Sequence, residues 1–107
     1  MSAPAPENAR QRIDKWLWHA RTVRTRTDAA ALVEHGHVRL NGKRVTAASQ
    51  PVRAGDVLTL ALDRTVRVMR VEGFAERRGS ASEARALYSE PAGRAEGYNA
   101  GQTRGTA

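Results

Sequence analysis

The sequence predicts an α+β fold in which two helices pack on a small, mostly antiparallel sheet. Two segments with apolar residues at helical spacing come first, between Arg12 and Gly36. After Gly36 the apolar residues alternate with polar ones, which is typical of strands, and Asn41-Gly42 is a strong signal for a tight hairpin. Two helices followed by antiparallel strands indicate one small domain.

The first helix is predicted over Arg12–Arg21. Its apolar stripe consists of Ile13, Trp16, Leu17 and Ala20. A separate basic face groups Arg12, Lys15 and His19. Trp18 falls on neither face, and two roles stay open for it: packing near Leu87 and Tyr88, or stacking on a nucleic-acid base.

The second helix is predicted to begin after Thr25 and to end at Gly36. Thr25 is a good capping residue with Asp28 three positions later, and glycine suits the left-handed conformation that follows many helices. The N-terminus of this helix offers backbone N–H groups and the positive end of the helix dipole, flanked by Arg24 and Arg26. We therefore predict a phosphate site there.

The predicted strands follow in chain order. Val38–Leu40 and Lys43–Val45 flank the hairpin turn, Ala54-Gly55-Asp56 forms a second turn, and further strands cover Val57–Leu62 and Thr65–Val71. After a loop from Gly73 to Gly79, Ser80 and Glu83 predict a capped helix that continues through Leu87 and Tyr88.

Composition divides the chain into four parts. We predict a disordered leader over 1–9, the domain over 10–73, a loop and short helix as an extension over 74–90, and a disordered tail over 91–107. The extension can pack on the domain or contact a protein partner, and the sequence leaves both open.

The positive charge is concentrated in one segment. The 107 residues include 18 Lys and Arg against 11 Asp and Glu, a net charge of +7. Residues 10–53 hold ten basic and three acidic residues, whereas residues 54–90 are balanced. Clustered cations favour a polyanion partner. The alternative is that these residues form an ordinary solvated surface. Genome composition can explain why 16 of the 18 basic residues are Arg, but it does not explain why the excess of basic residues ends at Arg53.

Several functional classes lack their signatures. Cysteine is absent, which excludes disulfides and thiolate metal sites. The three histidines are too few and too scattered for a metal site, the glycines around Lys43 lack phosphate-loop spacing, and no nucleophile stands near a base. We expect no metal, no cofactor and no catalysis. With no apolar run long enough for a membrane span and no secretory signal, we expect a cytoplasmic protein.

Four groups of residues, in this order, resemble the S4 RNA-binding domain over about residues 10–73. They are Arg12-x-Asp14-x-x-Leu17, Arg24-Thr25-Arg26 followed by Ala29, Gly36-x-Val38-x-Leu40-Asn41-Gly42-Lys43-x-Val45, and Val52-x-Ala54-Gly55-Asp56. Each group alone is a weak signal, but together they are specific. The resemblance implies an S4-type fold and RNA binding.

The surrounding residues narrow the resemblance to the fifteen-kilodalton bacterial heat-shock protein family. The similar residues are Lys15-Trp16-Leu17-Trp18, Glu76-Arg77-Arg78-Gly79-x-Ala81, Ala84 and Leu87-Tyr88. The family implies binding to ribosomal RNA on free large ribosomal subunits, including subunits stalled with peptidyl-tRNA after heat stress. It often has Lys-Pro-Ser after the hairpin, whereas this chain has Thr46-Ala47-Ala48-Ser49, so a cation and a rigid turn are missing there.

The family's RNA surface can be carried over to matching positions. These are Arg12, Lys15, Arg21, Arg24, Thr25, Arg26, Asn41, Lys43 and Arg44. The charge pattern selects nearly the same residues and adds Arg39. Lys and Arg would bind phosphate oxygens, with Thr25 and the next backbone amides as further donors, and we expect the cations to form a single patch. Asn41 can contact RNA or serve only the turn, and we expect Asp14 and Asp56 to orient Arg side chains.

Two other functions stay open. Two short helices and an excess of basic residues are compatible with a DNA-binding helix-turn-helix regulator. However, a β-hairpin directly follows the second helix, and that helix lacks Asn or Gln residues that could read bases. The S4 domain is also appended to RNA-modifying enzymes, but residues 74–107 contain no recognisable active site. We therefore expect a monomeric, non-enzymatic protein that binds ribosomal RNA, with at most weak binding to DNA.

Overall fold

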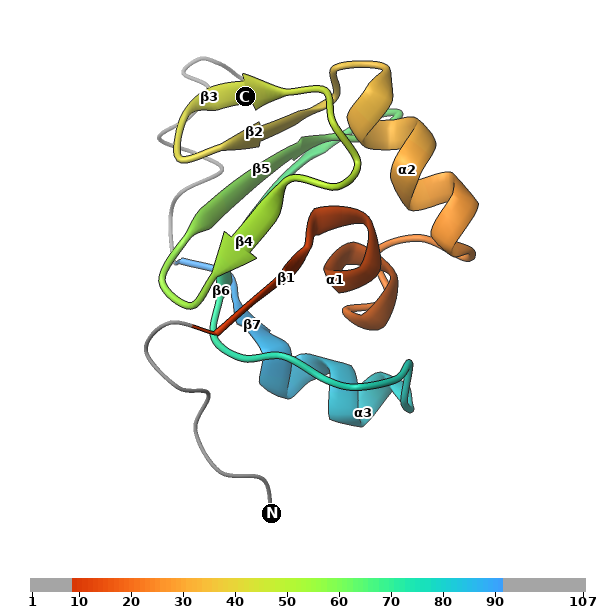
Figure 1. The fold of residues 1–107 in the computed structure, drawn as a ribbon, viewed down its shortest axis with the longest axis vertical. Coiled ribbons are helices and arrows are strands. Elements are labelled where there is room, and N and C mark those ends of the chain that lie inside the picture. The colour runs from red at the N-terminus through yellow and green to blue at the C-terminus, as the bar shows by residue number, and fades with distance from the viewer. Residues whose placement is uncertain (1–8, 92–107) are drawn as a thin grey trace.

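The computed structural model describes residues 9–91, as three helices, the last of them short, and seven strands (Figure 1). The helices are α1 (Ile13–His19), α2 (Arg26–Glu34) and α3 (Ala81–Ala84), which continues as the 3₁₀ turn Arg85–Leu87. The strands are β1 (Arg10–Arg12), β2 (Val38–Leu40), β3 (Lys43–Val45), β4 (Pro51–Arg53), β5 (Val57–Ala61), β6 (Val66–Val71) and β7 (Tyr88–Ser89).

The strands form two antiparallel sheets. The larger sheet has the order β3-β2-β5-β6-β7, and the smaller one pairs β1 with β4. In Figure 1, α1 and α2 lie on one side of the larger sheet, and β1 and β4 lie on the same side. The predicted α+β class, with two helices on a mostly antiparallel sheet, is confirmed.

One buried cluster joins the helices to the larger sheet. Leu17 of α1 and Val33 of α2 share it with Val38, Leu58 and Leu60 of the strands, all fully buried. Because side chains alternate between the two faces of a strand, Arg39 and Thr59 must lie on the opposite face. We call the face that meets the helices the inner face, and the other the outer face.

The first predicted helix is shorter than expected at both ends. Arg12 belongs to β1, whose partner β4 lies about forty residues away in the chain, and the backbone N–H of Ile13 donates to Gln50 O at 2.8 Å. α1 ends at His19, and Arg21 has a φ of 61°, which reverses the chain direction. His19 is 1% exposed, so the prediction that it lies with Arg12 and Lys15 on a basic face of the helix is wrong.

The second helix follows its local signals. The Thr25 hydroxyl oxygen accepts from the backbone N–H of Asp28 at 2.9 Å, as expected of a capping residue. Gly36 follows the helix with a φ of 82°, a conformation that glycine adopts without strain. The predicted start and end of this helix are both confirmed.

The segment after the sheet packs on the domain rather than extending from it. Trp16 Nε1 donates to Gly73 O at 2.9 Å, and Gln11 Nε2 donates to Ala75 O at 2.9 Å. Ser80 and Glu83 form the predicted capping box. Tyr88 was predicted as helical, but it belongs to β7, which pairs with the end of β6 and completes the sheet. Of the predicted leader (1–9) and tail (91–107), all but Ala9 and Pro91 lie outside the described residues.

Candidate nucleic-acid interface

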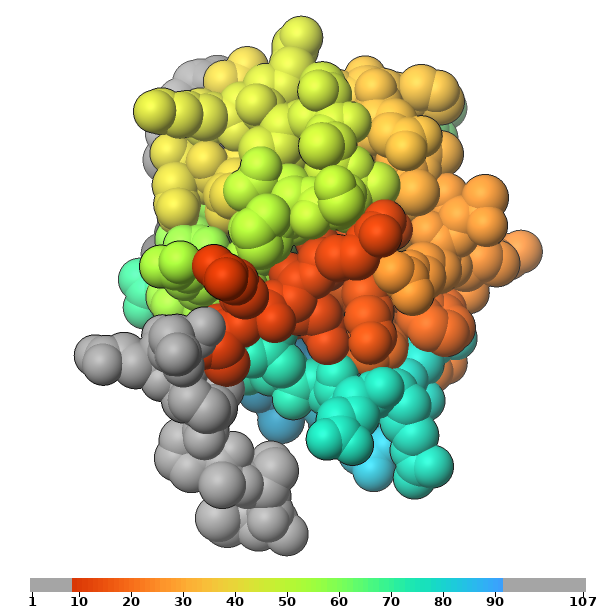
Figure 2. Space-filling model, viewed as in Figure 1, coloured from red at the N-terminus to blue at the C-terminus, as the bar shows by residue number. Residues whose placement is uncertain are grey.

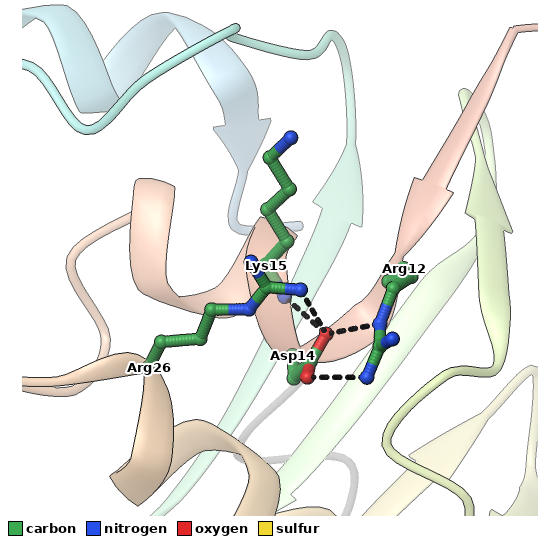
Figure 3. A network of polar contacts seen from close by, with 4 residues as sticks. All are labelled: Arg12, Asp14, Lys15 and Arg26. Atoms are coloured by element: carbon green, nitrogen blue, oxygen red, sulfur yellow. Dashed lines mark hydrogen bonds and ion pairs between the residues drawn. The ribbon is translucent and has the colours of Figure 1, made fainter.

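Two arginines from different elements converge on the carboxylate of Asp14, which also accepts from the backbone of Lys15 (Figure 3). Arg12, at the end of β1, donates from Nε and Nη2 to Asp14 Oδ1 and Oδ2 at 3.1 and 3.0 Å. Arg26, at the start of α2, approaches Asp14 Oδ1 with Nη2 at 3.6 Å. The backbone N–H of Lys15 donates to the same oxygen at 2.7 Å, while its ammonium group points away from the carboxylate.

Asp14 is buried and its basic partners are not. The exposed fraction is 5% for the Asp14 side chain, 51% for Arg12 and 41% for Arg26. A buried carboxylate is stable only when hydrogen bonds and opposite charges compensate for its lost hydration. Asp14 therefore holds two guanidinium groups at the surface, with donors left over for a ligand. The prediction that Asp14 orients Arg side chains is confirmed.

Two further arginines lie beside this group. In the small sheet Arg10 stands directly opposite Arg53, and both are exposed. Arg10 is two residues from Arg12, so the two side chains share one face of β1. We call Arg10, Arg12, Lys15, Arg24, Arg26 and Arg53 the helix-side cluster. In Figure 2, the segment that contains β1 and the start of α1 (red) runs between α2 (orange) and the residues that lead into and form β4 (yellow-green).

Arg10 and Arg53 were not among the predicted binding residues. Both counted toward the charge excess, but nothing local indicated that residues near 10 and near 53 form one sheet. The alternation Pro51-Val52-Arg53, with only Val52 buried, is the single signal for a strand there.

The N-terminus of α2 adds neutral donors to the helix-side cluster. The Thr25 oxygen is occupied by the N–H of Asp28, so its hydroxyl proton remains available to donate outward. Arg24 precedes it and is exposed. These groups, together with the positive end of the helix dipole, form a surface suited to an anion.

Arg21 points toward the C-terminal segment. Its Nη1 donates to Gly79 O at 2.7 Å. One guanidinium nitrogen is therefore engaged within the protein, and the side chain lies beside the turn between the helices.

The predicted binding residues of the hairpin differ in their surroundings: the Asn41 side chain is used within the protein, whereas Lys43 is exposed. Asn41 Nδ2 donates to Asp56 Oδ1 at 3.1 Å, and Asn41 Oδ1 accepts from the N–H of Val57 at 2.9 Å. Both polar atoms of Asn41 thus stabilise the turn region. The expectation that Asp56 orients an Arg side chain is wrong, because its other oxygen accepts from the backbone N–H of Arg53. Lys43 is exposed and stands opposite Leu40.

The predicted cations do not form a single patch. Arg39 and Arg44 stand directly opposite each other on β2 and β3, and both line a shallow pocket of about 260 Å³ with Thr59 and Ala61. This pocket lies on the outer face of the sheet, away from the helices. The cationic groups of Arg12 and Arg26 therefore converge on Asp14, but Arg39 and Arg44 form a separate group, which we call the outer pair.

Trp18 is engaged within the protein. The guanidinium of Arg78 lies 5.9 Å from its ring centroid, and Arg78 Nε donates to Trp18 O at 3.1 Å. Trp18 therefore packs on the C-terminal segment, but at Arg78 and not at Leu87 or Tyr88.

His19 is buried at the end of α1, near Lys15 and the backbone of Ala75. Burial lowers the pKa of His19 below its ordinary value of 6.5, and the positive charge of Lys15 lowers it further, although a hydrogen bond with the Ala75 backbone opposes both. His19 is therefore uncharged at neutral pH and adds nothing to the cationic surface.

Other kinds of site lack their components in the part of the chain that the structure describes. No three potential ligands among His, Cys, Asp and Glu gather there to hold a metal ion. None of the helices in residues 9–91 has the length and apolarity to cross a bilayer.

Comparison with known proteins identifies similar chains. The S4 domain family model matches residues 11–58. Heat shock protein 15 of Escherichia coli K12 is 42% identical over 81 residues, which cover 76% of this chain and 60% of that protein. The small ribosomal subunit protein uS4 of Rhodopseudomonas palustris is 42% identical over 48 residues, which cover 45% of this chain and 23% of that protein.

A solved structure extends the similarity to the whole fold. The structure of heat shock protein 15 from Vibrio cholerae, described as trimeric, superposes with a TM-score of 0.76 at 36% identity. The match covers 84% of this chain and 89% of that one. By contrast, the match with the Escherichia coli protein spans only 60% of its length.

Proposed function

Because the chain belongs to the heat shock protein 15 family and carries its S4 domain, we propose that it is a non-enzymatic protein that binds RNA through the helix-side cluster. The arrangement of Arg12, Lys15 and Arg26 around Asp14 is the observation that carries this proposal. One carboxylate holds the guanidinium groups of Arg12 and Arg26 at the surface, and the positive charge that remains there can be neutralised by a bound polyanion.

The geometry favours recognition of shape and backbone over sequence. Arg12 and Arg26 present guanidinium groups that can bind phosphate with two hydrogen bonds each, and Asp14 restricts their orientation. The N-terminus of α2 can accept a further phosphate. A folded RNA, with phosphates at several angles, matches a rigid surface of this kind.

We further propose ribosomal RNA on free large ribosomal subunits as the target, in heat stress or in the recycling of subunits stalled with peptidyl-tRNA. Membership of the heat shock protein 15 family and the match with a ribosomal protein support this target. A monomer is sufficient for the proposed site, since one chain supplies the whole helix-side cluster.

A double substitution tests the proposed site. Arg24→Gln with Arg26→Gln removes two cations but leaves the Arg12–Asp14 hydrogen bonds intact. Affinity for deproteinised large-subunit RNA should fall more than about tenfold, since a hydrogen bond to a charged group contributes about 1.5 kcal/mol or more. The melting temperature should change little, because the hydrogen bonds from Arg12 and from the backbone N–H of Lys15 still compensate the buried Asp14 carboxylate.

The matched control is Arg64→Gln with Arg85→Gln, which removes the same charge from exposed positions outside the cluster. If both double variants lose affinity equally, binding depends only on net charge and the proposed site is wrong. Competition with duplex DNA in the same assay tests the alternative target, and preference for the duplex would favour a DNA-binding role. The ribosomal particle that carries the protein in a low-salt sucrose gradient tests the large-subunit assignment.

A further inference from the structure

We propose that the outer pair, Arg39 and Arg44, is a second phosphate site, so that one molecule contacts two separate RNA segments, one on each side of the domain. This inference rests on the proposed function, because it assumes that RNA is the polyanion. It goes beyond it by adding a second site and a bridging mode of binding.

The outer pair is held in place by the backbone register. Arg39 of β2 stands opposite Arg44 of β3 and, on its other side, opposite Thr59 of β5. The Arg44 side chain lies close to Gly36. A Cβ atom added to Gly36 would be 3.4 Å from Arg44 Cδ. Both arginines line the pocket of about 260 Å³ on the outer face.

Among the described residues, no acidic side chain lines this pocket, and the one side-chain hydrogen bond of the pair is a long one, from Arg39 Nη1 to Gly42 O at 3.5 Å. Like charges directly opposite each other on neighbouring strands repel. Within residues 9–91, ion pairs form only at Asp14 and Glu90, neither of which belongs to the outer face pocket. An oxyanion placed between the two guanidinium groups would remove the repulsion and accept from their remaining N–H donors.

The position of the pair implies a second RNA segment. The helix-side cluster and the outer pair are separated by the buried layer that contains Leu17, Val33 and Leu58. A single RNA backbone lying on the helix-side cluster would have to wrap around the domain edge to reach the outer pair. Two segments of a folded RNA, or two RNA molecules, reach both sites directly.

A second copy of the protein fits this pocket less well than a phosphate does. A protein partner would need an acidic group to meet two guanidinium groups, since burying unpaired charges is costly. RNA supplies that charge at every nucleotide. The sedimentation coefficient of the RNA-free protein distinguishes a protein partner from RNA.

A bridging assay tests the proposal. A large-subunit RNA fragment that the wild-type protein binds is prepared in donor-labelled and acceptor-labelled batches, and energy transfer is recorded as protein is added. Wild-type protein should bring the two labels together, with transfer that falls again when protein exceeds RNA. Arg39→Gln with Arg44→Gln should abolish the transfer while affinity for a single fragment changes less than about threefold, because the helix-side cluster is intact.

Two further variants complete the design. Arg64→Gln with Arg85→Gln removes the same charge elsewhere and should leave energy transfer unchanged. Thr59→Glu places a carboxylate beside Arg39 without removing either arginine, and it should abolish transfer as the double substitution does, whereas Thr59→Gln should not.

The outcomes distinguish the two proposals. If the wild-type protein binds RNA but produces no transfer, the second site is wrong and the RNA-binding function stands. If transfer persists in the Arg39/Arg44 variant, bridging comes from protein oligomers and the second site is again wrong. If loss of transfer in that variant is accompanied by a lower sedimentation coefficient of the RNA-free protein, the outer face binds a protein partner and the second phosphate site is wrong. Failure of the wild-type protein to bind any RNA would overturn both proposals.

Discussion

Individual residues show how far local chemistry can be predicted. Asp14 follows an arginine by two positions in a basic segment, which indicated an orienting carboxylate, and its hydrogen bonds with Arg12 confirm that role. Asp56, next to Gly55, was expected to have the same role, but its oxygens accept from the Asn41 side chain and from the backbone N–H of Arg53. The difference depends on which chain segment returns to each carboxylate, and no local pattern contains that information.

Asn41 allows a test of structural against binding roles. Its φ of 51° is strained for most residues, and its amide bridges the hairpin to the turn before β5. Asn41→Ala should lower the free energy of unfolding by about 2 kcal/mol, and Asn41→Gly by less, since glycine tolerates this conformation. Urea unfolding measures both changes. A loss of RNA affinity in Asn41→Ala without loss of stability would instead place Asn41 in direct contact with RNA.

His19 should make stability depend on pH in a defined direction. Burial, and then the charge of Lys15, lower its pKa below 6.5, so the unfolded chain takes up this proton more readily than the folded protein. The contribution of neutral His19 is complete above pH 6.5 and is lost as the pH falls below that value toward the folded pKa.

The measurement compares urea midpoints at about pH 7 and about pH 5 in wild-type protein and in His19→Gln. The wild-type midpoint should fall more on acidification than that of the variant. His35→Gln, at an exposed position, is the control and should titrate like wild type. An identical pH dependence in wild type and His19→Gln would contradict the buried, neutral state of His19.

At the scale of elements, local signals sufficed where the interactions are local. Thr25 and Gly36 marked α2 correctly, and Asn41-Gly42 marked the hairpin. The start of α1 and the whole of β1 and β4 were not predicted, because residues 10–12 become a strand only by pairing with residues 51–53. Tyr88 was assigned to a helix for the same reason, since its strand depends on pairing with Val71.

The segment from Gly73 to Gly79 stabilises the helices that carry the proposed site. Arg78 donates to Trp18 O and to Val23 O, at 3.1 and 3.0 Å, and so holds the end of α1 and the following turn. Arg78→Gln should lower the free energy of unfolding by about 1–3 kcal/mol, because two partly buried carbonyl groups lose a charged donor.

Hydrogen exchange locates the effect of this substitution. Amides of the turn between α1 and α2 should exchange faster in Arg78→Gln, and RNA affinity should fall with it, since Arg24 lies in the loosened turn. Arg77→Gln changes the exposed neighbour and should have neither effect. Unchanged exchange in Arg78→Gln would show that the segment does not support the helices.

At the scale of the whole molecule, the charge excess of residues 10–53 predicted a polyanion partner, but it could not predict the shape of the surface. The fold gathers Arg10, Arg12 and Arg53 on one side and separates Arg39 and Arg44 on the other face of the sheet. A sequence reports how many cations a segment carries. Their division between two faces follows from strand register, which is a property of the complete fold.

The number of cations in the helix-side cluster predicts the salt dependence of binding. If about five to seven phosphates are neutralised, log affinity should fall with log salt concentration with a slope of about −4 to −6. Filter binding between low and physiological salt measures the slope, and in Arg24→Gln with Arg26→Gln it should become shallower by about 2. A slope near zero would mean that RNA phosphates do not dominate the interface.

Arginine modification by phenylglyoxal, with and without large-subunit RNA, tests the central claim most directly, because mass spectrometry reports each side chain separately. The helix-side cluster should be protected by RNA at Arg10, Arg12, Arg24, Arg26 and Arg53, while Arg64 and Arg85 should react as in the free protein. The opposite pattern, in which Arg64 and Arg85 are protected and the helix-side arginines react freely, would contradict the proposed binding surface.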